Sequence, residues 1–476
     1  MKTSNDSTQI LRPSLHFSAK QNWLNDPNGF SYYKGKYHLF YQYNPSGIAW
    51  GNMSWGHAIS DDLIHWEELD VALLPDKPYD QDGVFSGSAV TIMGRHFLYY
   101  TGVETVEEGL KQVQCIATSE DGLTYSKYEN NPIMVADHHG DTYDFRDPKM
   151  WLHNNVVYMI VASKKSKAGR ALIYKSDDGY NFDFVTKFTK KNTGHMWECP
   201  DLIEVDQQWL LIFSAMSVEG YPADNVAFIA PVDFDYTTLD TKVHEHELMD
   251  YGADFYAPQT MVDNKGRRIV IAWLRMEVPL FKEMQWVGMM TLPREIHYTD
   301  SGCHYQVIEE VFANKKNVLY ENRPVIDENS IDSPLDNLRK YRLKHQLAYE
   351  LTLTFDARTE VKISKGDGGG LWLGFNPTSR QVELVRELAH DSEEAGLKQK
   401  VTLSRDTFLS PEIMTDQITL QVIIDQSVAE IFINDGRHVI STVFRNSSKN
   451  NDLIIEGVLE EDALTLYELD NTSVRI

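Results

Sequence analysis

Short runs of apolar and aromatic residues recur at a regular spacing through the first 300 residues of the chain. Five such runs, each preceded by a polar or glycine-bearing turn, are YHLFYQY from Tyr37, HFLYYTG from His96, VVYMIVA from Val156, WLLIFSA from Trp209 and RIVIAWL from Arg268. Their first residues are between 53 and 60 residues apart, and no long helical pattern lies between residues 30 and 300. Strand-sized apolar runs bounded by turn residues indicate antiparallel sheets.

A repeat of this length holds about four strands, which is the content of one propeller blade. The five units therefore predict a five-bladed β-propeller, whereas a long β-sandwich would not explain the period. A second repeat supports this interpretation: SDDLIHW from Ser60, SEDGLTY from Ser119 and SDDGYNF from Ser176 each resemble a turn between the outer strands of one blade.

Polar motifs precede the five runs, each by about a dozen residues. They are NDPNGFSYY from Asn25, FSGSAVTIM from Phe85, RDPKMWLH from Arg146, ECPDLIEV from Glu198 and DFYAPQTMV from Asp254. Taken alone, each motif predicts an ordinary turn, because Asn, Asp, Pro and Gly favour turns. In a propeller, however, the first strand of every blade lines the central channel. The five motifs are therefore expected to meet at one axial pocket.

The last third of the chain loses this repeat after Tyr298 and becomes more charged. It then resumes as alternating strands such as YELTLTF, QITLQVIID, VAEIFIN and ALTLYEL, which predict a β-sandwich. The predicted class is all-β, with a propeller catalytic domain over residues 12–312, a linker over 313–335 and a sandwich domain over 336–476. No catalytic cluster is evident in the sandwich, so its expected role is to stabilise the propeller.

Composition narrows the classes of partner. A chain of 476 residues and 54.7 kDa is long enough for two or three domains. Its formal charge of −25 repels nucleic acid and anionic membranes, so neither is an expected partner, and a phosphorylated ligand would need a local basic group. The three cysteines are too few for a disulfide framework or a zinc site.

The N-terminal sequence MKTSNDSTQI has no apolar segment typical of a signal peptide, and the longest apolar runs are far shorter than a membrane span. A cytoplasmic location is therefore expected. The oligomeric state is not predicted.

Three carboxylates come from the strand starts: Asp26, Asp147 and Glu198. No histidine cluster or cysteine pair accompanies them, which disfavours metal catalysis. Cleavage of a glycosidic bond needs one protonated carboxyl group and one ionised carboxylate. A crowded pocket can separate their pKa values, because like charges raise one pKa while an adjacent cation such as Arg146 lowers another.

Taken in order, WLNDPNGF, FSGSA, FRDPK, WECPDL and DFYAPQ resemble the motif set of glycoside hydrolase family 32, which contains invertases, sucrose-6-phosphate hydrolases, inulinases and levanases. The resemblance runs from His16 to about Glu295, and the C-terminal part fits the family in pattern only. It implies a five-bladed propeller followed by a sandwich, retention of anomeric configuration and no cofactor.

The resemblance also implies roles for individual residues. Asp26 would be the nucleophile, Glu198 the general acid and base, and Asp147 the stabiliser of the transition state. Retention would require the carboxyl groups of Asp26 and Glu198 to lie about 5–5.5 Å apart. The positions that match the fructose subsite are Asn25, Gln42, Trp50, Phe85, Ser86, Arg146, Asp254 and Trp273.

Within the family, the chain looks most like the intracellular bacterial members. The expected substrates are sucrose, sucrose 6-phosphate or short fructo-oligosaccharides, and the net charge argues mildly against the phosphorylated sugar unless a local Arg or Lys reverses it. Two alternatives stay open. A fructosyltransferase would use the same covalent intermediate, and a non-catalytic sugar-binding propeller is disfavoured because all three carboxylates are present.

Overall fold

A computed structural model gives the structure of the chain. It describes residues 12–280, 284–321, 338–343, 348–365, 370–390, 402–445, 452–458 and 462–469. Residues 1–11, which carry most of the polar N-terminal sequence, lie outside the described residues, as do residues 322–335 of the predicted linker. The described structure is all-β apart from one 3-10 helix, Glu309–Asn314. That helix is neither long nor apolar enough to cross a membrane.

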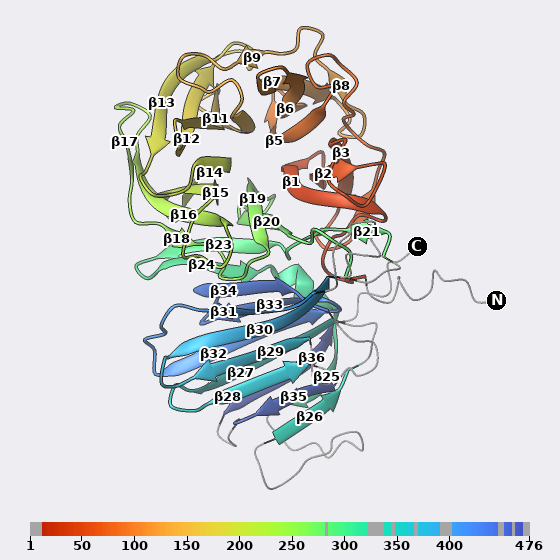
Figure 1. Cartoon of the computed structure of the whole chain (residues 1–476), viewed down its shortest axis with the longest axis vertical. Helices are drawn as coiled ribbons and strands as arrows, with labels where there is room; N and C mark the ends of the chain where they lie inside the picture. Colours follow the sequence, from red (N-terminus) through yellow and green to blue (C-terminus); the bar gives the residue numbers. More distant parts are fainter. Residues whose placement is uncertain are drawn as a thin grey trace, which may run out of the picture.

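Five antiparallel sheets form the propeller, which occupies the upper part of Figure 1. Blade 1 contains β1 (Asn22–Tyr33), β2 (Lys36–Asn44), β3 (Ser54–Ser60) and β4 (Trp66–Glu68). Blade 2 contains β5 (Gly83–Ile92), β6 (Arg95–Val106), β7 (Gly109–Ser119) and β8 (Ser126–Lys127), with β9 (Met134–Val135) paired to β7. Blade 3 contains β10 (Phe145–His153), β11 (Val156–Lys165), β12 (Ala168–Ser176) and β13 (Asp183–Thr189).

Blade 4 contains β14 (Met196–Val205), β15 (Gln208–Met216), β16 (Asn225–Phe234) and β17 (Thr241–Val243), with β18 (Glu247–Leu248) paired to β16. Blade 5 contains β19 (Phe255–Val262), β20 (Arg268–Leu274), β23 (Arg294–Thr299) and β24 (Gly302–Val307), with β22 (Met289–Met290) paired to β20. After blade 5 has begun, β21 (Trp286–Val287) pairs in parallel with β1. This pairing ties the last blade to the first.

The repeats predicted from the sequence correspond to the blades. Each of the five motif-bearing stretches lies mostly within the first strand of a blade, and each apolar run coincides with the second strand. The Ser-Asp turns join the third and fourth strands of blades 1 to 3. In each turn the serine hydroxyl accepts a hydrogen bond from the amide three residues later, as in Gly122 N to Ser119 Oγ (2.8 Å) and Gly179 N to Ser176 Oγ (2.9 Å). The five-bladed prediction is confirmed.

Two six-stranded sheets form the sandwich, below the propeller in Figure 1. One sheet has the order β25 (Lys315–Glu321), β36 (Ala463–Leu469), β27 (Ala348–Asp356), β32 (Gln417–Asp425), β33 (Val428–Ile433) and β34 (His438–Val443). The other has the order β26 (Leu338–Arg342), β35 (Asp452–Glu456), β28 (Val361–Lys365), β29 (Leu371–Asn376), β30 (Gln381–His390) and β31 (Thr402–Leu409). Because β25 pairs with β36, residues 315–321 of the predicted linker are a strand of the sandwich.

Buried ion pairs join the two domains. Arg294 on β23 contacts Asp250 (3.1 Å) from the propeller and Glu430 (2.9 Å) from β33 of the sandwich. His16 lies between Asp425 (3.0 Å) and Glu430 (3.2 Å), and all of these side chains are almost fully buried. Isolated buried charges would be costly, so the pairing fixes the sandwich against blade 5. The propeller core also extends into apolar residues of β33 and β34.

Candidate active site

Every inner strand of the propeller is interrupted at the same place. The pairing of each inner strand with the second strand shifts register between Leu24 and Pro27, Phe85 and Gly87, Arg146 and Lys149, Glu198 and Asp201, and Tyr256 and Gln259. A β-bulge of this kind frees residues from the ladder and redirects their side chains. The five bulges therefore place the polar motif residues of five blades at equivalent positions around the axis.

Proline is present in four of these bulges. Pro27, Pro148, Pro200 and Pro258 have no N–H to donate, so a bulge is where an inner strand can accommodate them. The residue before proline has a positive φ in three blades: 62° at Asp147, 47° at Cys199 and 48° at Ala257. Left-handed backbone is unfavourable for these residue types, and such strain concentrates at functional sites.

A cavity lies where the bulges meet. It is lined by Ser86, Gly87, Asp147, Pro148, Lys149, Cys199, Pro200, Asp201, Pro258 and Gln259, which come from the inner strands of blades 2 to 5. Lys149 is paired with Asp201 at 3.1 Å on its wall. The inner strands of four of the five blades therefore line one axial cavity, and no described residue of blade 1 is among its lining residues.

Asp26 from blade 1 is held by neighbouring polar groups. Ser86 Oγ donates to Asp26 Oδ2 at 2.7 Å, and Asn25 Nδ2 donates to Asp26 Oδ1 at 3.1 Å. Asn25 is in turn fixed by the indole N–H of Trp23 (2.8 Å). The thiol of Cys199 lies 3.8 Å from Asp26 Oδ2. Because Ser86 and Cys199 line the cavity, these contacts hold the carboxylate of Asp26 beside it.

Asp147 from blade 3 is buried, with only 6% of its side chain exposed. Its Oδ2 accepts a hydrogen bond from the backbone N–H of Cys199 (3.0 Å) in blade 4, and its own N–H donates to Thr101 Oγ1 (3.0 Å) in blade 2. Cys199 therefore lies between Asp26 and Asp147, which places these two carboxyl groups on either side of the same residue.

Glu198 from blade 4 is more exposed, at 21% of its side chain. Its Oε1 accepts hydrogen bonds from Arg146 Nη2 (2.9 Å) and Nε (3.1 Å), and its Oε2 accepts one from the Tyr256 hydroxyl (2.6 Å). Arg146 also donates to Asp144 Oδ1 at 2.9 Å. Both oxygens of Glu198 are thus oriented by donors from the adjacent blades.

The pKa values of Asp26 and Asp147 show how strongly neighbouring carboxyl groups interact. Burial, and then the charge of Glu198, raise the pKa of Asp26 to about 6, against the hydrogen bonds from Ser86 and Asn25. Burial raises the pKa of Asp147 to about 7, where the guanidinium of Arg146 opposes the rise and the charges of Glu198 and Asp26 add to it. Carboxyl groups that share a water-poor site cannot all ionise at their usual pH.

The pKa values of Arg146 and Tyr256 are also raised, so both side chains keep their protons. Burial acts to lower the pKa of Arg146, but the carboxylates of Glu198, Asp147 and Asp144 outweigh it and raise that pKa, so the guanidinium stays charged. Burial raises the pKa of Tyr256 well above its usual value. Tyr256 is therefore a neutral hydrogen-bond donor to Glu198 over the whole physiological pH range.

The remaining residues predicted for the sugar subsite lie in different surroundings. Trp273 is buried edge-to-face against Trp23 with a ring separation of 6.0 Å, and its indole N–H has no partner among the described residues. Trp50 is 58% exposed and contacts the Phe85 ring edge-on. Gln42 is buried and donates to the Val84 carbonyl (3.0 Å). An aromatic rim and an unpaired buried donor suit a sugar ring and its hydroxyl groups.

Asp254 is placed elsewhere. Its Oδ2 accepts hydrogen bonds from Val443 N (2.8 Å), from Thr442 Oγ1 (3.3 Å) and from Arg386 Nη1, all of which belong to the sandwich. The carboxylate is therefore committed to the interface between the domains, in a contact across 132 residues of sequence.

Tyr256 is the residue that sequence reasoning missed, although a signal for it existed. It occupies the position before Ala257-Pro258 that Glu198 occupies before Cys199-Pro200. Arg146 holds the same position in the RDP motif. Alignment of the three inner strands would therefore have predicted that these three side chains meet, as the structure shows.

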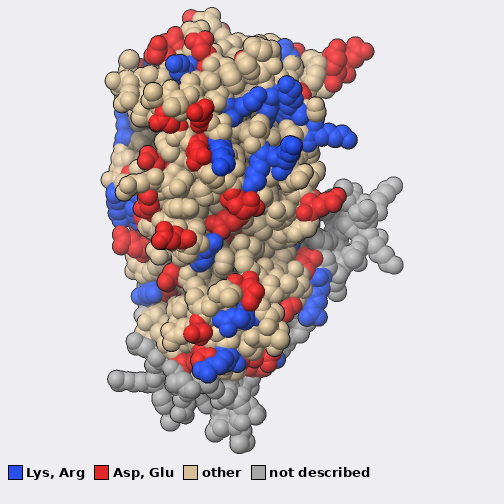
Figure 2. All heavy atoms as spheres, turned by 90° about the vertical axis from the view of Figure 1, so that its left-hand side faces the viewer, with Lys and Arg blue, Asp and Glu red and all other residues tan. Residues whose placement is uncertain are grey.

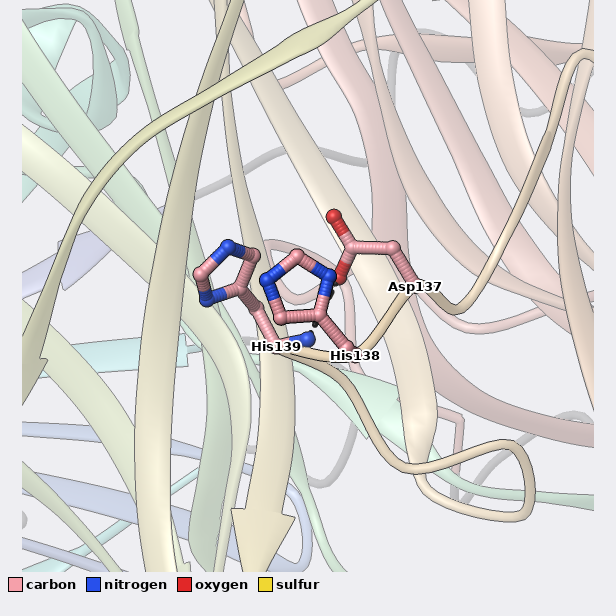
Figure 3. A group of neighbouring side chains, drawn as sticks. All are labelled: Asp137, His138 and His139. Atoms are coloured by element: carbon pink, nitrogen blue, oxygen red, sulfur yellow. Dashed lines mark hydrogen bonds between the residues drawn. The ribbon is translucent and has the colours of Figure 1, made fainter.

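Asp137, His138 and His139 form one further group with potential metal ligands in the described part of the chain (Figure 3). Their ligand atoms lie within 4.8 Å of one another on the loop between β9 and β10. Asp137 Oδ1 already accepts hydrogen bonds from His139 N (2.7 Å) and the Tyr174 hydroxyl (3.1 Å). The group lies on a loop outside the inner-strand bulges, so it does not belong to the cluster of Asp26, Asp147 and Glu198.

Comparison with known proteins agrees with this geometry. The family description "Glycosyl hydrolases family 32 N-terminal domain" matches residues 16–308, and "Glycosyl hydrolases family 32 C terminal" matches residues 312–462. A sucrose-6-phosphate hydrolase of Escherichia coli is 33% identical over 448 residues, which cover 90% of this chain and 88% of that protein.

Two solved structures share the complete architecture. The sucrose-6-phosphate hydrolase of Lactobacillus gasseri superposes with a TM-score of 0.82 at 26% identity, covering 98% of this chain and 94% of the other. A mutant of a Bombyx mori family 32 β-fructofuranosidase, solved in complex with sucrose, superposes with a TM-score of 0.79 at 28% identity, covering 97% and 93%. Propeller and sandwich therefore occur together in these proteins as they do here.

Proposed function

We propose, for a chain that belongs to glycosyl hydrolase family 32 and is a glycoside hydrolase of the β-fructofuranosidase type, that it cleaves the terminal β-D-fructofuranosyl bond of sucrose, sucrose 6-phosphate or short fructo-oligosaccharides by double displacement. The observation that carries the proposal is the clustering of Asp26, Asp147 and Glu198, from three different blades, around Cys199 and Arg146 beside the axial cavity. Retention of configuration follows if one of two facing carboxylates attacks the sugar.

Asp26 is the proposed nucleophile. One of its oxygens attacks the anomeric carbon of fructose while the bond to the leaving sugar breaks, which gives a covalent fructosyl-enzyme. Ser86 and Asn25 hold the carboxylate and stabilise its ionised form, since both hydrogen bonds lower its pKa. Water later attacks the same carbon and releases Asp26 as a free carboxylate.

Glu198 is the proposed acid and base. It donates a proton to the glycosidic oxygen in the first step and accepts one from the attacking water in the second. The pKa values of the neighbouring Asp26 and Asp147 are raised, because like charges in one buried site oppose full ionisation. Arg146 and Tyr256 orient Glu198 for both transfers.

Asp147 is proposed to bind fructose hydroxyl groups and to stabilise the positive charge that develops on the ring. An anionic group is most effective where water is excluded, and the side chain of Asp147 is less exposed than that of Glu198 (6% against 21%). Trp273, whose buried indole N–H is unpaired, would donate to another hydroxyl. Trp50 at the exposed end of the site would stack on the leaving sugar.

The proposal is tested by incubation with sucrose, sucrose 6-phosphate and 1-kestose in the presence of methanol. Release of the non-fructose sugar, together with formation of methyl β-D-fructofuranoside by NMR, is the expected result. Methyl α-fructoside would contradict double displacement, and no release from any substrate would contradict the hydrolase assignment. Oligosaccharide products that dominate at high sucrose would favour the fructosyltransferase alternative.

A further inference from the structure

The leaving sugar has a defined side of the pocket. The side chain of Asp147 is 6% exposed whereas that of Glu198 is 21% exposed, so solvent reaches the carboxyl cluster more readily at Glu198. The group that protonates the glycosidic oxygen lies between the fructose and the leaving sugar. Residues beyond Glu198 in the outward direction therefore face the leaving sugar and determine which one is accepted.

Arg275 is linked to Glu198 through a single side chain, that of Tyr256. Its guanidinium carbon stacks over the ring of Tyr256 at 4.9 Å from the ring centroid, and the hydroxyl of the same Tyr256 donates to Glu198 Oε2 at 2.6 Å. Arg275 Nη2 donates to the carbonyl oxygens of Asn225 (2.6 Å) and Ala253 (2.7 Å). The planar group is thus held rigidly, because stacking and two backbone hydrogen bonds act together.

The charge of Arg275 is not neutralised by a carboxylate. Its hydrogen-bond partners are backbone carbonyls, and no Asp or Glu of the described residues forms an ion pair with it. The other cations near Glu198 are different. Arg146 is shared between Glu198 and Asp144, and Lys164 is paired with Asp144. Arg275 is half-buried and retains its Nε and Nη1 groups as donors.

We propose that Arg275 binds a phosphomonoester on the leaving sugar and thereby makes sucrose 6-phosphate the preferred substrate. The inference rests on the proposed function, since it assigns a binding role beside the same acid residue. An arginine held in a fixed plane presents paired N–H groups that match phosphate oxygens. With a formal charge of −25 on the whole chain, a local cation at the pocket is required to offset repulsion of an anionic substrate.

Basic side chains on the outer strands of the blades do not provide a cation at the pocket. Figure 2 shows Lys and Arg side chains interspersed with Asp and Glu on the face that lies to the left in Figure 1. Lys187 on β13 and Lys242 on β17 are exposed residues of the outer strands of blades 3 and 4. The outer strand of a blade is remote from the axial channel. Lys187 therefore serves as a control, because its loss changes the net charge by the same amount without touching the pocket.

The test compares kcat/KM for sucrose 6-phosphate and for sucrose in the wild type, Arg275→Gln, Arg275→Lys and Lys187→Gln. For Arg275→Gln we expect a fall of about 10- to 100-fold with sucrose 6-phosphate and less than about 3-fold with sucrose, mainly through KM. Arg275→Lys should recover part of the preference, and Lys187→Gln should match the wild type. Added salt should reduce the wild-type preference and have less effect in Arg275→Gln.

Each other outcome overturns the assignment. Equal losses for both substrates would mean that Arg275 only supports the backbone of Asn225 and Ala253, and unchanged kinetics would mean that it does not meet the substrate. A wild type that prefers free sucrose would contradict the phosphate site while leaving the hydrolase function intact. If neither sugar is cleaved, the proposed function fails, and calorimetric titration with glucose 6-phosphate and glucose still decides whether Arg275 binds the phosphate.

Discussion

The Tyr256 hydroxyl donates a 2.6 Å hydrogen bond to Oε2 of Glu198, from the corresponding position of the next blade. Arg146, at that position in the preceding blade, occupies the other oxygen of Glu198. Three successive inner strands therefore contribute one orienting residue, one carboxyl group and a second orienting residue. The pocket is a consequence of the blade repeat, in which each β-bulge presents its residue to those of the neighbouring blades.

Replacement of Tyr256 by Phe removes this hydrogen bond and little else. Because the side chain keeps its shape and its stacking with Arg275, thermal stability should stay within about 1 kcal/mol of the wild type. Loss of a donor that orients Glu198 should lower kcat for sucrose about 10-fold. The alkaline limb of the pH–rate profile should also move, which a purely structural role would not cause. Wild-type kcat and an unchanged profile would show that the hydrogen bond is dispensable.

The acid limb of kcat/KM should report Asp26. Its pKa is raised to about 6, and a nucleophile must be ionised, so protonation of Asp26 should lower the rate below about pH 6, in addition to the loss caused by protonation of Asp147, whose pKa is about 7. Ser86→Ala removes a hydrogen bond that lowers this pKa, and the midpoint should therefore move to higher pH. Ser60→Ala, in a turn at the far end of blade 1, is the matched control. A midpoint near pH 4 would contradict the burial of Asp26.

Asp147→Asn should make the protein more stable at pH 8 while it loses activity. The folded-state pKa of about 7 lies above the ordinary value of 3.8, so the folded protein binds more protons than the unfolded chain between these values. Its stability therefore falls as pH rises through this window. Asparagine escapes this penalty, which should be at least about 1 kcal/mol since each pKa unit corresponds to about 1.4 kcal/mol. Denaturant unfolding should show that the free energy of unfolding of Asp147→Asn exceeds that of the wild type at pH 8 but not at pH 4.5.

The domain interface should weaken at alkaline pH. Hydrogen bonds and charges from Asp425 and Glu430 outweigh burial and raise the pKa of His16 from 6.5 to about 9. A raised histidine pKa gives stability that is complete below pH 6.5 and is lost as pH rises through about 9. His16→Gln should therefore lower the melting temperature at pH 6.5 and reduce its decline toward pH 9.5. Parallel curves for the variant and the wild type would contradict a charged His16.

Much of the fold could be predicted from the sequence, because the blade repeat is a local pattern of apolar runs and turns. The five blades and the sandwich are confirmed, and the motif residues Asn25, Asp26, Ser86, Arg146, Asp147 and Glu198 are linked through one network of contacts. The exact separation of the carboxyl groups depends on bulge geometry, which the sequence indicates only through the repeated X-Pro pairs. Their roles stay predictions.

Asp254 shows what a motif alone could not predict. It lies two residues before Tyr256, and its carboxylate is bound by Arg386, Thr442 and Val443 of the sandwich. Those partners are more than a hundred residues away in sequence, so no local pattern indicates the contact. The same holds for Arg275, whose position beside the acid residue follows from stacking on Tyr256 in three dimensions.

Trapping of the intermediate tests the central claim most directly. In Glu198→Gln, an aryl fructoside with a good leaving group should still react with Asp26, but the fructosyl-enzyme should accumulate because no base activates water. Peptide mass mapping after acid quench should then place one fructosyl group on the peptide that contains Asp26, and Asp26→Asn in the same background should abolish it. Label on another residue, or turnover of the substrate without any adduct, would contradict Asp26 as the nucleophile.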